Sequence, residues 1–235
     1  MYYYCDSAAL AGLLNEELLV SSPGDFDDPF EFLPDLSKTL QSEDYGRWLQ
    51  LAASDRLYAL CLSRKANDVR MWAQYGQKHT GMMLTIDVKA VKPLRTFWEQ
   101  KKIVDIDYRK TNQARPANHK DLGKEEHSEQ LQNWFSCKSK EWASQEETRI
   151  LIPGSCLRAK PEYGRIGMLQ GRMRGFLKVP KQSIKKVTLG LRSSDDLYTS
   201  VREIREQKGA RWDIEKLRLH PSTYTFVGEP VSNPV

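Results

Sequence analysis

A short polar cluster, Gln145-Glu146-Glu147, stands directly before the segment TRILIP (Thr148–Pro153), which is mostly apolar. This segment has the composition of a buried strand, so the cluster is predicted to lie at the mouth of that strand. Side chains two residues apart on a strand share a face, which puts Gln145, Glu147 and Arg149 in one row. A carboxylate in such a row can stabilise a cationic, sugar-like transition state while the amide orients an acceptor. A Glu beside an Arg can also be a plain ion pair, so both interpretations stay open.

Aromatic side chains form two further candidate sites. On a predicted helix, Trp72 and Tyr75 of the segment MWAQYG are three residues apart and share a face. At the start of the chain, the run YYY puts Tyr4 on one face of a strand and Tyr3 on the other. Such side chains are typical of a packed core, and they could also provide a stacking floor for a flat ring such as a nicotinamide or a base.

The loop FDDPFEF contains three carboxylates, Asp27, Asp28 and Glu31, close together in the sequence. Pro29 disfavours helical backbone at the residue before it, which predicts a rigid, irregular loop whose phenylalanines are held in the core. The same loop could line a ligand cleft. Its carboxylates could also bind a divalent ion, although their spacing has no EF-hand pattern.

The chain carries a net charge of +5 with a pI near 8.9, and many of its basic residues fall within one stretch. They are Arg158, Lys160, Arg165, Arg172, Arg174, Lys178, Lys181, Lys185 and Lys186. Such a stretch can attract nucleic acid or the phosphates of a dinucleotide. It is equally compatible with a solvated, charged face.

The remaining composition excludes several classes of protein. The four cysteines and four histidines are dispersed, with no CxxC pair and no zinc-finger spacing, so they predict no metal site. No run approaches the roughly 20 apolar residues of a membrane helix, and the N-terminus lacks a basic patch followed by an apolar core. A cytoplasmic protein without a membrane partner is therefore expected.

The elements that position these residues can be predicted from hydrophobic periodicity and turn signals. Strands are expected at residues 1–5, 18–21, 56–63, 81–88, 101–108, 148–153, 173–179, 186–191, 215–219 and 224–227. Helices are expected at residues 8–17, 36–54, 67–77, 124–140 and 194–207, mostly in the N-terminal half. This pattern, with no repeat or low-complexity linker, predicts a single α+β domain over residues 1–235 with a mixed or antiparallel sheet core.

The order of the motifs resembles a widespread bacterial family of unknown function. Its members begin with a Tyr-Lys-Tyr-like strand and carry an Asn-Asp-Pro-Phe loop, a Met-Trp-x-x-Tyr-Ala helix and a Trp-x-x-Glu-x-Glu-x-x-Arg-like segment. The corresponding stretches here are YYY, DDPF, MWAQYG and WASQEETR, and the resemblance covers residues 1–192. The chain departs from the family pattern at Tyr3, Asp27 and Gln145, where the family usually has Lys, Asn and Glu.

More remotely, the layout is similar to the ADP-ribosyltransferase superfamily. That resemblance implies a split mixed or antiparallel sheet that holds NAD, and a catalytic Glu at the head of a late strand. Matched by order, Glu147 would be the catalytic carboxylate, and Gln145 would position the attacking atom.

The same resemblance implies a set of residues that bind NAD, which is consumed as a substrate, and it requires no metal. Tyr3 or Tyr4 would occupy the first-strand position, and Ser63 or Tyr75 the middle position. The rest of the set is Trp72 and Arg149.

On this resemblance, the protein is expected to cleave the nicotinamide–ribose bond of NAD. It would transfer ADP-ribose to nucleic acid or protein, as a bacterial toxin or antiphage effector, with a possible antitoxin or regulatory partner. Two other functions stay open. One is a non-catalytic domain that binds nucleic acid or a partner, and the other is a metal-dependent nuclease that uses the carboxylates of the FDDPFEF loop.

Overall fold

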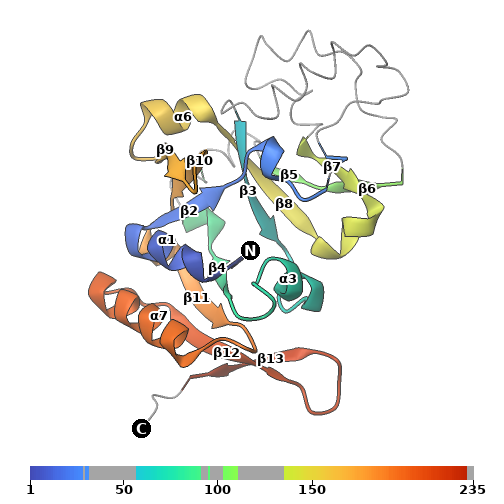
Figure 1. Cartoon of the computed structure of the whole chain (residues 1–235), viewed down its shortest axis with the longest axis vertical. Helices are drawn as coiled ribbons and strands as arrows, with labels where there is room; N and C mark the ends of the chain where they lie inside the picture. Colours follow the sequence, from blue (N-terminus) through green and yellow to red (C-terminus); the bar gives the residue numbers. More distant parts are fainter. Residues whose placement is uncertain (29, 32–56, 91–94, 96–102, 111–134, 232–235) are drawn as a thin grey trace. The chain divides into compact units, whose positions relative to one another are not determined.

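The structure, a computed structural model, describes residues 1–28, 30–31, 57–90, 95, 103–110 and 135–231. The chain is divided into two compact units. Unit 1 consists of Met1–Leu18, Leu62–Arg95 and Lys178–Val235, and unit 2 consists of Leu19–Cys61 and Thr96–Leu177. Figure 1 shows the described elements along the chain.

Unit 1 contains a large mixed sheet. Its strands are β1 (Tyr2–Cys5), β4 (Met82–Ile86), β11 (Ile184–Leu189), β12 (Asp213–Leu219) and β13 (Phe226–Pro230), in the order β13-β12-β11-β4-β1. Neighbouring strands run antiparallel, except that β11 and β12 run parallel. At the β1 edge, Tyr2 pairs with Ser63, the last residue of β3 (Leu57–Ser63).

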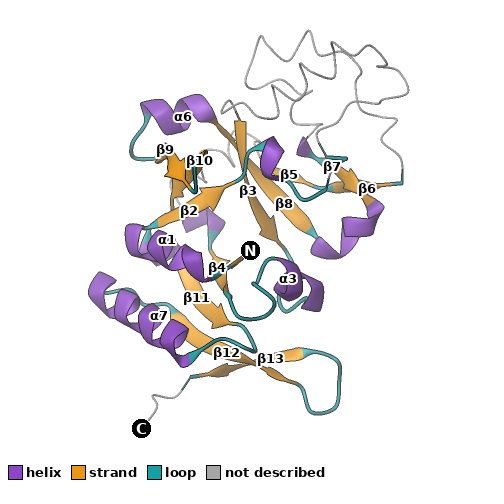
Figure 2. Ribbon diagram, viewed as in Figure 1, coloured by secondary structure: helices purple, strands orange, loops and turns teal. Residues whose placement is uncertain are grey.

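Three described α-helices belong to unit 1: α1 (Leu10–Asn15), α3 (Val69–Gln74) and α7 (Asp195–Lys208). Helix α7 connects β11 to β12, and this crossover explains why that one pair is parallel (Figure 2). Its start is capped by the Ser194 hydroxyl, which accepts a bond from the N–H of Leu197, and it ends at Gly209 in the left-handed conformation.

The core of unit 1 forms where α3 packs with the strands. Trp72 is fully buried and meets the ring of Tyr4 edge to face, with 5.3 Å between ring centroids. Met71, Met83 and Leu217 complete this cluster. The apolar face of the short helix α3 is therefore used for packing within unit 1.

Unit 2 contains three sets of strands. Residues 57–61 of β3 lie beside β8 (Glu147–Pro153), which pairs antiparallel with β5 (Ile103–Asp105). The second set is β9 (Gly164–Leu169) with the unit 2 parts of β10 (Arg172–Lys178) and β2 (Glu17–Val20), whose residues 178 and 17–18 belong to unit 1. The third set is the parallel pair β6 (Asp107–Arg109) and β7 (Cys137–Ser139). Every residue of β8 is buried, including Glu147, Thr148 and Arg149, which precede its apolar residues Ile150–Pro153.

Short helical turns complete unit 2. They are η2 (Pro23–Asp25), η4 (Lys140–Gln145) and α6 (Gly154–Ala159). A small apolar core of Leu57, Ala59, Phe135 and Leu151 lies among these elements. None of the described helices is both long and apolar enough to cross a membrane.

Most predicted elements overlap an observed one. The predicted strands 1–5, 18–21, 56–63, 81–88, 148–153, 173–179, 186–191, 215–219 and 224–227 correspond to β1, β2, β3, β4, β8, β10, β11, β12 and β13. The predicted helices 8–17, 67–77 and 194–207 correspond to α1, α3 and α7. A mixed α/β chain with a large mixed sheet is thus confirmed.

Several predictions need correction. The predicted helix 124–140 is wrong at its C-terminal end, where residues 137–139 form β7 and pair with β6. The predicted strand 101–108 is interrupted at Ile106, which separates β5 from β6. Strand β9 and helix α6 were not predicted. The predicted helix 36–54 lies outside the described residues, and the single domain stays a prediction.

Candidate functional site

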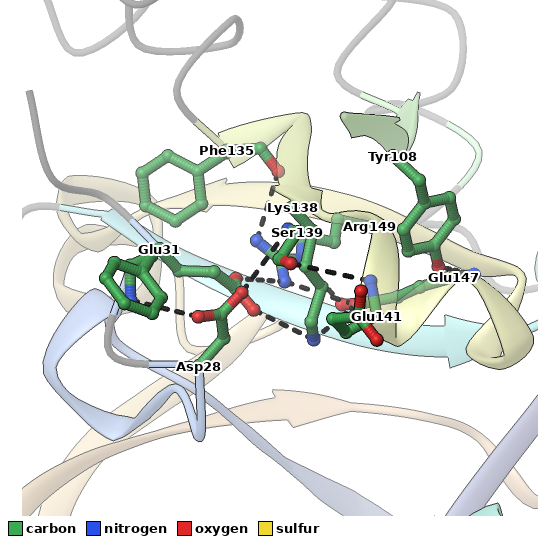
Figure 3. A network of polar contacts seen from close by, with 10 residues as sticks. Asp28, Glu31, Tyr108, Phe135, Lys138, Ser139, Glu141, Glu147 and Arg149 are labelled. Carbon is green, nitrogen blue, oxygen red and sulfur yellow. Dashed lines mark hydrogen bonds and ion pairs between the residues drawn. The ribbon is translucent and has the colours of Figure 1, made fainter. Parts of the chain in front are cut away.

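Four charged side chains of unit 2 form a buried ionic cluster, which consists of Glu31, Lys138, Glu147 and Arg149 (Figure 3). The Nε of Arg149 donates to Oε1 of Glu147 at 2.6 Å, and its Nη2 donates to Oε2 of Glu147 at 3.2 Å and also pairs with Glu31. The Nζ of Lys138 lies 2.8 Å from Glu31 Oε1 and 3.2 Å from Glu147 Oε2. Each carboxylate therefore contacts both cations.

The charges of the cluster compensate one another, since two cations face two anions. Burial alone would raise the pKa of Glu147, but Arg149 and Lys138 outweigh it and lower that pKa to about 2. Burial likewise lowers the pKa of Lys138, while Glu147 and Glu31 raise it above its ordinary value. Glu147, Lys138 and Arg149 are thus held in their charged forms at neutral pH.

The backbone before β8 differs from the strand that the sequence predicted. Gln145 is the last residue of the helical turn η4, and Glu146 adopts the left-handed conformation with φ of 44°. Strand β8 begins only at Glu147, so alternation does not relate Gln145 to Glu147 and that part of the prediction is wrong. From Glu147 onward alternation holds, and Arg149 lies on the same face, bonded to it.

Partly exposed aromatic side chains adjoin the cluster. The N–H of Glu147 donates to the hydroxyl of Tyr108 at 2.8 Å. The Nζ of Lys138 lies 4.9 Å from the ring centroid of Trp142. On the apolar side, the guanidinium of Arg149 stacks over Phe26 at 4.3 Å. Burial raises the pKa of the Cys61 thiol well above its ordinary value, and the negative charge of Glu147 raises it further.

The carboxylates of the FDDPFEF loop have separate roles. Asp28 is buried and accepts bonds from the backbone N–H of Phe30 at 2.9 Å and of Ser139 at 3.4 Å. Glu31 belongs to the ionic cluster, whereas Asp27 is exposed. Among the residues that the structure describes, no group of three or more His, Cys, Asp or Glu side chains is placed to hold a metal ion.

The predicted aromatic set lies in unit 1. The hydroxyl of Tyr4 donates to the carbonyl of Lys65 at 3.0 Å, and the hydroxyl of Ser63 donates to the same carbonyl at 3.2 Å. Tyr4 and Trp72 are part of the unit 1 core.

Two further members of that set are less buried. Tyr75 is half-buried at the edge of the same core, and Tyr3 is half-buried on β1 opposite Leu84. Their proposed contact with a ligand stays a prediction. Gln145, Glu147 and Arg149, by contrast, belong to unit 2.

Sequence reasoning missed two residues that define this site. Lys138 was placed in a predicted helix, and its partners lie 9 residues and more than 100 residues away, so no local pattern marks it. Tyr108 is only the last residue of the strand expected at residues 101–108. Its hydroxyl meets the backbone of residue 147 through a contact across 39 positions of the chain, which no spacing rule reveals.

Comparison with known proteins shows that part of the chain is similar to one protein family. Residues 71–150 match the model of a family described as "Protein of unknown function (DUF2971)". The matched stretch contains Lys138, Glu147 and Arg149, but not Glu31. A likeness to a family of unknown function is thus confirmed over this stretch. No curated protein and no solved structure matches the chain.

Proposed function

We propose that the protein is an NAD-dependent ADP-ribosyltransferase in which Glu147 is the catalytic carboxylate. The supporting observation is that Glu147 stands at the head of β8 as an ionised group with a pKa of about 2. An oxocarbenium-like transition state is stabilised by a fixed negative charge. Two neighbouring cations keep this carboxylate ionised throughout the physiological pH range, and its charge becomes available to the substrate where one of these cations is displaced.

In the proposed reaction, the bond between ribose C1′ and the nicotinamide nitrogen breaks, and its electron pair leaves with nicotinamide. Glu147 accepts a hydrogen bond from the ribose 2′-hydroxyl and offsets the positive charge that develops on the sugar. A nucleophilic oxygen or nitrogen of a nucleic-acid or protein acceptor then bonds to C1′ and releases its proton to water. Gln145, two residues ahead of Glu147, positions this acceptor.

Substrate binding must open one contact of the ionic cluster, because Glu147 is only 6% exposed and both of its oxygens already bind cations. Arg149 binds Glu147 through two bonds, at 2.6 and 3.2 Å, whereas Lys138 has one contact with it at 3.2 Å, so we assign the exchange to Lys138. Lys138 stays paired with Glu31, at 2.8 Å, while the ribose 2′-hydroxyl takes the place of Lys138 at Glu147. The rings of Tyr108 and Trp142 offer stacking surfaces for nicotinamide beside this position.

The proposal is tested by comparing Glu147→Gln with Glu31→Gln. Each variant removes one negative charge from the same cluster, and only the first removes the proposed catalytic group. Nicotinamide release from NAD is measured with nucleic acid and protein acceptors, at a temperature at which circular dichroism shows every variant folded. Glu147→Gln is expected to lower the rate by about a hundredfold or more, and Glu31→Gln by less than about tenfold. An equal loss in both variants, or no release by the wild type, contradicts the proposal.

A second candidate function is a non-catalytic domain that binds nucleic acid or a partner. It is favoured by the complete internal pairing of the cluster, in which each carboxylate contacts both cations. On this function the four charges serve only the fold, and Glu147→Gln lowers stability without changing ligand affinity. The two functions therefore give different expectations for the two variants. A transferase loses activity mainly in Glu147→Gln, whereas in a non-catalytic domain Glu147→Gln and Glu31→Gln have similar effects.

A further inference from the structure

Strands β9 and β10 of unit 2 form a hairpin with a tight turn. The turn residues Gln170 and Gly171 both have positive φ, 51° and 76°, as expected of a two-residue hairpin loop. The register pairs Met173 with Met168 and Phe176 with Arg165. A hairpin with so short a turn is a defined, narrow ribbon.

The two faces of this hairpin differ near its base. On the inner face Leu177 is fully buried, and a Cβ added at Gly175 would lie 2.6 Å from Val20 and 2.9 Å from Tyr58. This face therefore packs tightly on unit 2. Three arginines lie on the outer face together with Phe176: these are Arg165, Arg172 and Arg174.

The tip of the hairpin is exposed on both faces. Met168 and Met173, on the inner face, are 65% and 54% exposed, and Leu169, on the outer face, is 40% exposed. Within the described part of the chain, the apolar side chains next to the turn are thus far more exposed than Leu177 at the base of the hairpin.

The charged side chains of the hairpin are all positive. Neither strand contains an acidic residue, and residues 158–177 contain five basic side chains and one acidic side chain, Glu162. The guanidinium of Arg165 lies 4.2 Å over the ring of Phe176, which fixes its orientation on the outer face. Arg174 is paired with Asp25, whereas Arg172, next to the turn, is exposed.

We propose that the β9–β10 hairpin binds duplex DNA, with Arg165 and Arg172 on the phosphates and the tip in a groove. Arginine pairs with phosphate through a planar, bidentate fork, and a duplex presents phosphates on both sides of each groove. The major groove of B-DNA is wide enough to admit a two-stranded ribbon, and apolar side chains there can contact the methyl group of thymine. An acidic peptide would match the arginines but not the exposed methionines at the tip.

This inference concerns binding and does not depend on the proposed transferase activity, since no NAD is needed to test it. If both hold, DNA is the acceptor that the hairpin delivers to Glu147. Failure of DNA binding with retained nicotinamide release would remove only the hairpin proposal.

The test measures the anisotropy of a labelled 20-base-pair duplex as a function of salt, with the full-length protein. Arg165→Gln/Arg172→Gln is compared with Lys185→Gln/Arg211→Gln, which removes the same charge from exposed positions of unit 1. The hairpin variant is expected to weaken binding at least tenfold and to reduce the slope of log K against log salt by about 1.8, since each phosphate contact contributes about 0.9. The control variant should retain the wild-type slope.

A third variant separates the apolar tip from the arginines. Met168→Gln/Met173→Gln should weaken duplex binding severalfold while leaving the salt slope unchanged, because it removes no charge. Three results would overturn the proposal. These are equal binding by the two charge variants, equal affinity for the single strand and the duplex, and displacement of the duplex by poly-glutamate at equal charge concentration.

Discussion

At the scale of single residues, the ionic cluster shows how ion pairing can outweigh desolvation. A lone buried carboxylate takes up a proton, whereas Glu147 remains ionised because two cations lie within hydrogen-bonding distance. The same compensation makes each member dependent on the others. Removing one charge leaves an unbalanced buried charge, which typically costs about 3–5 kcal/mol of stability.

Acid should therefore weaken the fold through Glu147. Its pKa is lowered from 4.5 to about 2 in the folded chain, so it contributes stability above pH 4.5 that is lost as pH falls towards 2. A shift of this size corresponds to about 3 kcal/mol. In urea unfolding, the destabilisation caused by Glu147→Gln should be constant above pH 4.5 and shrink progressively below it. Parallel pH profiles for the wild type and the variant would show that this carboxylate is not the group that titrates.

The sequence predicted this site in part, for reasons that differ from residue to residue. Alternation along a strand correctly put Glu147 and Arg149 on one face. It failed for Gln145, because the left-handed backbone at Glu146 breaks the alternation. Lys138 was beyond prediction, since it belongs to the site only through pairing of distant segments.

At the scale of elements, helix α3 shows how one side chain organises a short segment. Its six residues are too few to form a stable helix alone, so packing and capping must supply the stability. Asp68 caps the start, and its carboxylate accepts bonds from the N–H of Arg70 at 2.9 Å and of Met71 at 3.2 Å. The cap also fixes the position from which Trp72 enters the core of unit 1.

Replacing this cap should destabilise the protein by a defined amount. Asp68→Ala is expected to lower the free energy of unfolding by about 1–2 kcal/mol, because two helical N–H groups lose their acceptor. Asp68→Asn retains a capping oxygen and should stay within about 0.5 kcal/mol of the wild type. Urea denaturation of the three proteins measures both differences. An equal loss in Asn and Ala would mean that the charge near Lys65, and not the cap, is what stabilises α3.

Elements with strong local signals were predicted and those defined by pairing were not. Strands β3 and β4 are almost entirely apolar, β8 contains the apolar run Ile150–Pro153, and α7 has both a Ser cap and a terminal Gly. Strand β9, with the sequence GRIGML, contains two glycines and lacks alternation, so it becomes a strand only because β10 pairs with it. Strand β7 is likewise fixed by its pairing with β6.

At the scale of the whole molecule, the chain path bears on whether the two units unfold separately. Unit 1 is assembled from three segments and unit 2 from two, and strands β2, β3 and β10 each cross from one unit to the other. Neither unit is a contiguous piece of chain that could fold first and leave the other intact. Separate domains usually follow one another along the sequence, joined by linkers that few contacts cross.

We therefore expect unfolding in one cooperative step, as for a single domain. Native-state hydrogen exchange tests this with two fully buried residues, Leu84 of β4 in unit 1 and Ile150 of β8 in unit 2. Their amides should exchange with the same opening free energy, equal to that of global unfolding. Glu31→Gln, a change confined to unit 2, should lower both values by the same amount. A drop at Ile150 with Leu84 unchanged would instead show that unit 2 opens independently, since the altered cluster would then weaken only the unit that contains it.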